Sequence, residues 1–315
     1  MAGMLALTAL PLPAPAQDAR GPLRLIVPQP PGGAADFIAR ILADGMGREL
    51  GQAVVVENRG GANGTIAVNA LKASRNDGTA VLLGGVSLFA FNPSLYSNLP
   101  YDPFRDFTYV APVVDTVLVL VANPRLGVGT LADLMDRARA QPERLTYASV
   151  GIGNSTHLAM EMITGTAGVR MTHVPFTGST PAVTSVLTAQ TDCMVIPLQT
   201  VIPHIGTGAL VPLAVMNSGR VATMPDVPAL RETGFESLAM PGWYALVGPA
   251  GMPDAVTERL NAAVRATVMN PDAARRLREQ ALEPMTATAA EVRRAVETDS
   301  ANWGAFIRRT NLKVE

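Results

Sequence analysis

The stretch that decides the fold is residues 23–42, LRLIVPQPPGGAADFIARIL. It opens with the short apolar run 23–27, which is typical of a buried strand. The segment 28–35 is rich in proline, glycine and alanine, as expected of a loop. Beyond it, apolar side chains recur at helical spacing on one face: Phe37, Ile38, Ile41, Leu42, Met46 and Leu50. The stretch therefore predicts a strand, a small-residue loop and a helix in succession.

The same succession recurs along the chain. Strands are predicted at 54–56, 80–83, 117–121, 145–150, 171–174, 193–196, 211–216 and 243–247, and helices at 65–73, 131–140, from 155 and from 180. Strands with few polar residues are typical of sheets covered on both faces, and their alternation with helices favours parallel pairing. We therefore expect an α/β protein of two lobes, each a mainly parallel sheet flanked by helices.

Composition excludes several classes of protein. The chain has 315 residues, of which 48% are hydrophobic and 16% charged, so it has enough apolar residues to form a folded core. Its net charge of -1 and the absence of basic runs argue against a nucleic-acid partner. The single cysteine, Cys193, lies in an apolar run and is expected to be buried. The three histidines are widely spaced, so we expect no metal site, and we expect no cofactor.

The N-terminal segment predicts export. Residues 1–16, MAGMLALTALPLPAPA, are apolar and end in the small-x-small pattern Ala14-Pro15-Ala16 of a signal-peptide cleavage site, although the positively charged start of such a signal is missing. The alternative is a disordered apolar N-terminus. No later segment has the ~20 uninterrupted apolar residues of a membrane helix. We expect residues 1–21 to be this signal or disordered segment, and the protein to be periplasmic.

Three loops at predicted strand-to-helix junctions are the candidate ligand-binding segments: 28–36, 149–157 and 175–181. The first turn of a helix has backbone N–H groups without internal partners and the positive end of the helix dipole, so it can bind a carboxylate without a cationic side chain. Hydroxyl groups in the second and third loops could orient such an anion. The alternative is that the loops are tight turns whose hydroxyls cap helices. Three similar loops favour a ligand held between two lobes.

Motifs of catalysis are missing. The chain has no Gly-x-x-x-x-Gly-Lys phosphate loop and no Gly-x-Ser-x-Gly elbow, and 151–156 lacks the third glycine of a dinucleotide finger. Ser155 and His157 are two positions apart, so on a helix they point in different directions and do not form a nucleophile–base pair. We expect His157 to be an oriented first-turn or core histidine and no catalytic residue to be present. Asp36 is a candidate ligand group, with capping of the first helix as the alternative.

With these loops in view, the chain resembles the Bug-type periplasmic receptors of tripartite tricarboxylate transporters. The resemblance extends from residue 22 to the end. It is carried by ten segments in order: 25–36, 55–59, 92–96, 99–103, 153–158, 174–176, 178–182, 203–205, 225–228 and 249–253.

The resemblance implies a two-lobed, type II-like periplasmic binding fold with a ligand cleft between the lobes. It implies that a small carboxylate solute, aromatic or aliphatic, is captured there and delivered to membrane permease subunits. Loops 30–36, 151–157 and 176–180 would clasp the solute, and Ser87 completes the set. We expect a monomer and these ligand-binding residues: Pro31, Gly32, Gly33, Ala34, Ala35, Asp36, Ser87, Gly153, Asn154, Ser155, Thr156, His157, Phe176, Thr177, Gly178, Ser179 and Thr180.

The chain departs from the family pattern within these loops. Gln29 replaces a common aromatic residue and Ala35 a common hydroxyl, while Phe176-Thr177 replaces a frequent Tyr-Lys and Ile196-Pro197 a frequent Asp-Asn. These changes predict a cleft that disfavours the ammonium group of an amino acid and favours an apolar or aromatic carboxylate.

The sequence also predicts where the two lobes divide, and it leaves two other functions open. Residues 22–122 and 240–315 are expected to form one lobe and 123–239 the other, with hinge crossings near 120–125 and 236–242. One alternative function is a ligand-presenting partner of a sensor kinase. The other is an α/β hydrolase or transferase using Ser155, Ser179 or His157.

Overall fold

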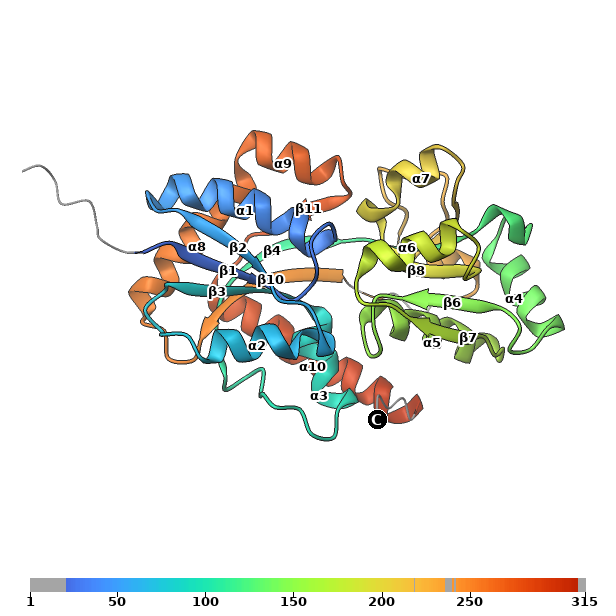
Figure 1. Cartoon of the computed structure of the whole chain (residues 1–315), viewed down its shortest axis with the longest axis horizontal. Helices are drawn as coiled ribbons and strands as arrows, with labels where there is room; N and C mark the ends of the chain where they lie inside the picture. Colours follow the sequence, from blue (N-terminus) through green and yellow to red (C-terminus); the bar gives the residue numbers. More distant parts are fainter. Residues whose placement is uncertain (1–20, 218, 236–239, 241, 311–315) are drawn as a thin grey trace, which may run out of the picture.

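The computed structural model describes residues 21–217, 219–235, 240 and 242–310, and it has two α/β lobes side by side (Figure 1). The predicted signal segment lies outside these residues except for Gly21. In the described part of the chain, no helix combines the length and apolarity needed to cross a membrane.

The first lobe is built on a six-stranded sheet in the order β11-β4-β10-β3-β1-β2. Its strands are β1 (Leu23–Val27), β2 (Val54–Asn58), β3 (Ala80–Gly85), β4 (Phe107–Thr116), β10 (Gly242–Pro249) and β11 (Leu282–Pro284). One face is covered by α1 (Ala34–Leu50), α8 (Asp254–Met269) and α9 (Pro271–Arg278). The other face carries α2 (Thr65–Lys72) and α10 (Ala289–Thr310), and the short α3 (Asn92–Leu95) packs against α10. Each face therefore has its own apolar core, as expected of a sheet between two helical layers.

The second lobe is built on a five-stranded sheet in the order β7-β6-β8-β5-β9. Its strands are β5 (Leu118–Ala122), β6 (Thr146–Ser149), β7 (Thr172–Pro175), β8 (Cys193–Pro197) and β9 (Val211–Val215). Helices α4 (Leu131–Ala140) and α5 (Ser155–Ala167) cover one face. Helix α6 (Ser179–Leu187) and the short α7 (Ile202–Gly206) cover the other. The side chain of Cys193 is fully buried in this lobe, and burial raises the pKa of its thiol.

Both sheets are mixed, which corrects the expectation of mainly parallel sheets. Strands β1, β2 and β3 pair in parallel, as do β6, β7 and β8. However, β10 runs antiparallel to both of its neighbours in the first sheet, and β5 does so in the second. Each of these two strands is the first one after the chain changes lobe. The chain arrives from the other lobe at the edge of the sheet where the neighbouring strands end. The arriving strand therefore runs antiparallel to those neighbours.

The change of sheet falls at Val117, between β4 and β5. The strand Leu118–Ala122 pairs with β8 and β9 and so belongs to the second sheet, although the sequence places the lobe boundary at residue 122. We therefore propose a boundary about five residues earlier. Met240 bonds through its backbone to Met216 beside β9, and β10 belongs to the first sheet. Most of the predicted return segment 236–242 lies outside the described residues, so that crossing stays a prediction.

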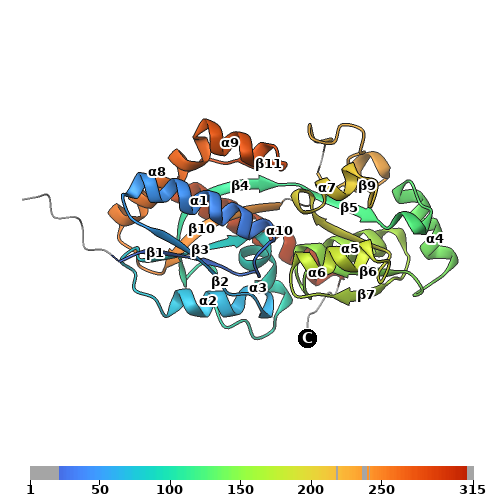
Figure 2. The same cartoon turned by 45° about the horizontal axis from the view of Figure 1, so that its top comes forward.

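Helix α10 packs against both lobes. Trp303 and Ile307 of this helix share one apolar cluster with Leu118 and Leu120 of the second lobe, and the Trp303 ring lies 5.0 Å from that of Phe91. In Figure 2 the helix lies behind the junction of the lobes. The two lobes are therefore joined by a buried apolar contact as well as by the chain crossings.

Candidate functional site: a cleft between the lobes

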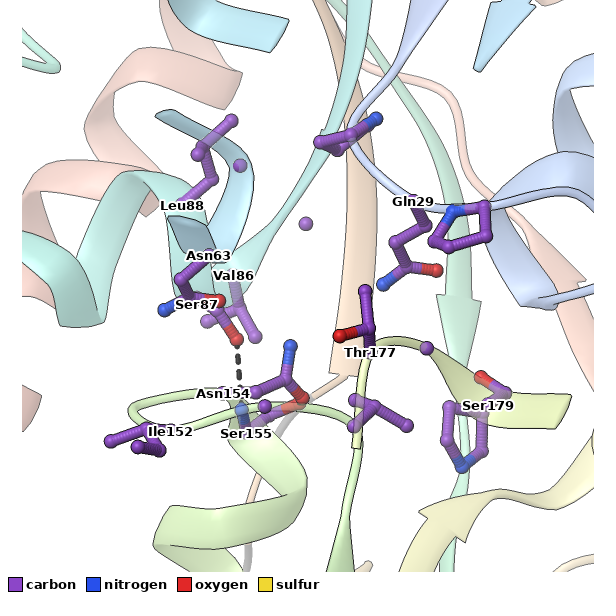
Figure 3. Close-up of a pocket in the computed structure, with 18 of the residues that line it drawn as sticks. Gln29, Asn63, Val86, Ser87, Leu88, Ile152, Asn154, Ser155, Thr177 and Ser179 are labelled. Carbon is purple, nitrogen blue, oxygen red and sulfur yellow. Dashed lines mark hydrogen bonds between the residues drawn. The ribbon is translucent and has the colours of Figure 1, made fainter. Parts of the chain in front are cut away.

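A cavity of about 480 Å³ lies between the two lobes. The first lobe contributes the loop 28–30, the turn 61–64 and the segment 85–88 after β3. The second lobe contributes the loop 150–155 before α5 and the loop 175–179 before α6 (Figure 3). The volume lies within the range of small-molecule sites. Two of the three loops predicted from the sequence thus line one cavity, together with the start of the third.

The cavity lining carries no formal charge among the described residues. Its polar side chains are amides and hydroxyls: Gln29, Asn63, Ser87, Tyr96, Thr116, Asn154, Ser155, Thr177, Ser179 and Tyr244. Apolar groups occupy the remainder, including Leu118, Phe176 and the indole of Trp243. A charged ligand in this cavity must therefore be neutralised by dipoles rather than by a counter-charge.

The N-terminus of α5 is already occupied by protein acceptors. The side chain of Asn154 caps the helix by accepting a hydrogen bond from the backbone N–H of Thr156, at 3.2 Å. The backbone N–H of Ser155 donates across the cleft to Oγ of Ser87, at 2.9 Å (Figure 3). Ser87 begins a π-helical turn, Ser87–Phe91, a local geometry that is frequent at functional sites. This hydrogen bond joins the two lobes directly.

We expect Ser87→Ala to loosen the closed arrangement of the lobes. The substitution removes the acceptor for the Ser155 N–H, and such a hydrogen bond contributes about 0.5–1.5 kcal/mol. Small-angle scattering of the solute-free protein should show a larger radius of gyration for the variant than for the parent. Identical scattering curves would show that this contact does not influence closure.

The N-terminus of α6 is open by comparison. Its N-cap is Gly178, with a φ of +99° and no capping side chain. Within the described residues, no acceptor is recorded for the backbone N–H of Ser179 or Thr180, and Pro181 has no N–H to satisfy. A Cβ on Gly178 would lie 3.2 Å from the ring of Pro30 in the other lobe. The free donor of Ser179 thus stands at a cavity wall where the lobes meet, and that of Thr180 lies behind it.

Ser155 and His157 do not form a nucleophile–base pair. Nδ1 of His157 accepts a hydrogen bond from the backbone N–H of Gly153, at 3.1 Å, and no contact joins the ring to the Ser155 hydroxyl. Ser155 Oγ instead donates to the side chain of Asn154, at 3.2 Å. His157 is thus an oriented first-turn histidine, as the sequence predicts.

A family model described as the tripartite tricarboxylate transporter family receptor matches residues 38–312. The chain belongs to this receptor family. BugT of Bordetella pertussis is 32% identical over 98% of this chain and 94% of its own length. The solved structure of R. palustris Rpa4515 with adipate has a TM-score of 0.89 at 28% identity and covers 93% of this chain and 98% of its own. MatC from Rhodopseudomonas palustris with bound malate has a TM-score of 0.86 at 26% identity, over 90% and 98% of the two chains.

These likenesses confirm the Bug-type resemblance and the two-lobed periplasmic binding fold. The family is one of solute-binding receptors, which agrees with the expectation of a protein without catalytic residues.

Only some of the residues predicted to bind the solute line the cavity of this receptor. Those in its lining are Ser87, Asn154, Ser155, Phe176, Thr177, Gly178 and Ser179. Those behind it are Pro31, Gly32, Gly33, Ala34, Ala35, Asp36, Gly153, Thr156, His157 and Thr180. Their part in binding remains a prediction for both groups, but only the first group can contact a solute in this arrangement.

The loop 31–36 lies behind the cavity because it packs on the second lobe. A Cβ on Gly33 would lie 3.4 Å from Oγ of Ser179, and one on Gly32 would lie 3.4 Å from Oγ1 of Thr180. The start of α1 therefore faces the start of α6, and only residues 28–30 of this loop reach the cavity.

The carboxylate of Asp36 forms its hydrogen bonds at the start of its own helix and in the turn before it. It accepts hydrogen bonds from the backbone N–H of Gly32, at 3.1 Å, and from the Arg40 guanidinium, at 3.0 and 3.1 Å. Burial alone would raise the pKa of Asp36, but the hydrogen bonds from Arg40, Gly32 and Asn58 hold it below its usual value. The N-cap of α1 is Gly33, which has no side-chain cap, so Asp36 bonds to the backbone just before the helix and to Arg40 within it.

Several lining residues were not predicted. Asn63 lies in the 3-10 turn Ala62–Gly64, and its amide donates to Asn92 Oδ1, at 2.7 Å. The glycine-rich segment 58–64 before a predicted helix was the available signal for this residue. Thr116 and Trp243 enter the cavity from the two lobe crossings, and no local pattern indicated them.

Proposed function

We propose that the protein is a periplasmic solute receptor that captures a small carboxylate in the cleft and delivers it to the membrane permease of a tripartite tricarboxylate transporter. The observation that carries the proposal is an uncharged cavity between two lobes, with the free helix N–H of Ser179 at one wall. Family membership and the adipate- and malate-bound relatives support it.

The carboxylate is proposed to bind at the start of α6. The N–H group of Ser179 lies in the cavity lining and, like that of Thr180 behind it, lacks a protein acceptor, whereas those at the start of α5 are paired with Ser87 and Asn154. A helix N-terminus stabilises an anion through these donors and through the helix dipole. The amide of Gln29 and the hydroxyl of Thr177 lie near this end of the cavity and can add hydrogen bonds (Figure 3).

The rest of the solute is proposed to be apolar or aromatic. Beyond the polar groups, the cavity is lined by side chains such as Val86, Leu118, Phe176 and Trp243. Burying apolar solute surface against them contributes about 25 cal/mol per Å². Part of this gain offsets the cost of removing the carboxylate from water.

Carboxylates are expected to bind better than amino acids of the same size. The described lining contains no aspartate or glutamate, so an ammonium group would be buried without a partner, which costs several kcal/mol. Calorimetric titration with matched pairs, such as 3-phenylpropionate against phenylalanine and adipate against 2-aminoadipate, tests this. An amino acid that binds more tightly than its deaminated partner would contradict the proposed specificity.

A thermal-shift screen against small carboxylates tests the proposed function itself. A solute at about 100 times its dissociation constant should stabilise the protein by about 2.7 kcal/mol. Failure of every carboxylate in a broad panel, with calorimetry in agreement, would count against a carboxylate receptor. Delivery to a permease requires a separate test, which is solute uptake in cells with and without the receptor.

A further inference from the structure

A stacked pair of histidines lies directly behind the cleft loop 151–155. The rings of His157, in the first turn of α5, and His173, in β7, have centroids 4.0 Å apart and planes 12° from parallel. The ring of Tyr147, in β6, stacks on His173 with a centroid distance of 4.9 Å. None of these rings is part of the cavity lining, and the proposed binding of a carboxylate does not use them.

One hydrogen bond ties His157 to the loop. The backbone N–H of Gly153 donates to Nδ1 of His157, at 3.1 Å. An imidazole nitrogen accepts a hydrogen bond only when it carries no proton, so the neutral ring must hold its proton on Nε2. The side chain of His157 is only 12% exposed, which leaves little room for water to replace this contact.

His173 is connected to the same loop through Ser149. Its Nε2 lies 2.7 Å from Ser149 Oγ, which in turn exchanges hydrogen bonds with the backbone C=O and N–H of Gly151, at 3.2 and 3.3 Å. A charged His173 can still donate to the Ser149 oxygen, so this connection survives protonation. The His157 contact does not, because a protonated Nδ1 would point its N–H at the N–H of Gly153.

The surroundings keep both rings neutral near neutral pH. Burial lowers the pKa of His157, although the charge of Glu161 opposes this, and burial together with the charge of His157 lowers the pKa of His173 to about 4. Charging both rings would place two like charges about 4 Å apart. The titratable groups beside the pair are Glu161, whose carboxylate lies 3.9 Å from His157, and the stacked Tyr147, which interacts with Cys193.

Tyr147 and Cys193 keep their protons as the pH is lowered below 7. Burial raises the pKa of Tyr147 and of Cys193, so both stay protonated. The carboxylate of Glu161 accepts a hydrogen bond from the Tyr147 hydroxyl and lies 3.9 Å from Nε2 of His157. Among the stacked rings and the thiol, the histidine pair is therefore the group whose charge changes as the medium is acidified.

We propose that His157 is a positioning residue that holds the loop 151–155 in its solute-binding shape only while its ring is neutral. The inference rests on the proposed function, because the loop matters as a wall of the solute cleft. Acidification adds a proton to Nδ1 and breaks the contact with Gly153. The loop then loses this support, and with it Gly151, Ile152 and Ser155, which form part of the cavity wall. Solute affinity then falls as the medium is acidified.

The direction follows from linkage. A histidine whose pKa is lower in the folded protein than in the unfolded chain stabilises the fold fully above the unfolded value, and this contribution is lost as the pH falls through the folded value. With an unfolded value of 6.5 and a folded value near 4 for His173, the window runs from about pH 6.5 downwards to about 4. The pKa of His157 is lowered as well, so its contact with Gly153 is lost in the same direction, as the pH falls.

Nuclear magnetic resonance of the solute-free protein tests the positioning role without any ligand. The chain has only three histidines, so ring signals can be assigned with single variants. We expect His157 to be the Nε2–H tautomer at pH 7 and the amide signals of residues 151–155 to move together with its protonation. A proton on Nδ1 at pH 7, or a titration of His157 that leaves those amides unmoved, would overturn the proposal.

Three variants test the consequence for binding, with adipate as the probe. His157→Asn keeps an acceptor close to the position of Nδ1 but cannot be protonated, so it should bind as the parent does at pH 7 and lose less affinity at pH 5. His157→Phe keeps a ring without an acceptor and should bind about 2- to 10-fold more weakly at both pH values. His204→Asn, in α7, serves as the control and should keep the pH profile of the parent.

The outcomes separate the two proposals. A parent and a His157→Asn variant with the same pH profile would overturn the role of His157 even though adipate binds. A parent that binds neither adipate nor any other carboxylate would count against the proposed function, whereas the tautomer and the loop signals would still decide whether His157 positions the loop.

Discussion

Thr177→Trp is expected to abolish solute binding, with a loss of affinity of at least about 100-fold, or 2.7 kcal/mol. Thr177 lies in the loop between β7 and α6, where its exposed side chain points into the cavity (Figure 3). The lobes already touch beside it, at Gly33 and Ser179. An indole at this position takes the space of the solute, and the lobes cannot move apart to restore that space without opening the cleft.

Thr184→Trp is the matched control. Thr184 is also an exposed threonine, but it lies in the second turn of α6 and outside the cavity lining. We expect this variant to retain binding, with small effects on stability because surface substitutions usually change it by less than about 0.5 kcal/mol. Calorimetry with the tightest carboxylate from the thermal-shift screen measures both. Parent-like affinity in Thr177→Trp would show that the solute lies elsewhere.

Gly45→Ala is expected to destabilise the first lobe by about 1–3 kcal/mol. Gly45 lies on the face of α1 that packs against α8, and a Cβ there would lie 2.2 Å from Cγ2 and 2.8 Å from Cβ of Thr267. Thr267 is buried and its hydroxyl is bonded to the backbone of Ala263. Because the Thr267 Cβ is fixed to its helix, the two helices must separate. The substitution would otherwise favour a helix by up to about 1 kcal/mol.

Gly47→Ala in the same helix should have the opposite sign. The nearest atom to a Cβ at Gly47 is the backbone oxygen of Gln52, at 3.5 Å, which is an ordinary contact. This variant gains helix propensity without a clash, so we expect it to be neutral or more stable by up to about 1 kcal/mol. Urea unfolding of both variants, and of Gly45→Ala combined with Thr267→Ala, measures the difference. Equal midpoints for the two alanine variants would contradict the packing argument.

Local structure could be predicted well where neighbouring residues determine it. The helix predicted at 131–140 forms as Leu131–Ala140, and its start has both hydrogen bonds of a capping box between Thr130 and Asp133. The same box forms between Thr288 and Glu291 at the start of α10. These signals are contained within a few residues, so no tertiary information is needed to interpret them.

Strand pairing was harder to predict. No strand was predicted over Phe107–Thr116, although β4 there pairs with β10 along its whole length. Pro112 and Asp115 interrupt its apolar run, and a proline cannot donate to a sheet. The pairing accommodates the proline at a register irregularity opposite Tyr244 and Ala245. The strand that pairs with β4 lies more than a hundred residues away in the sequence. The segment 107–116 by itself therefore gives no signal that it forms a strand.

The sequence by itself determined the succession of strands, small-residue loops and helices, the membership of a receptor family, and loops before α5 and α6 that lack charged side chains. These properties depend on side chains close together in the chain. Only the tertiary structure decided that α5 has its first N–H paired with Ser87 while α6 keeps its donors free, and that loop 31–36 packs on α6 instead of facing the solute. Such choices depend on how two lobes meet, and the contacting groups come from segments far apart in the sequence.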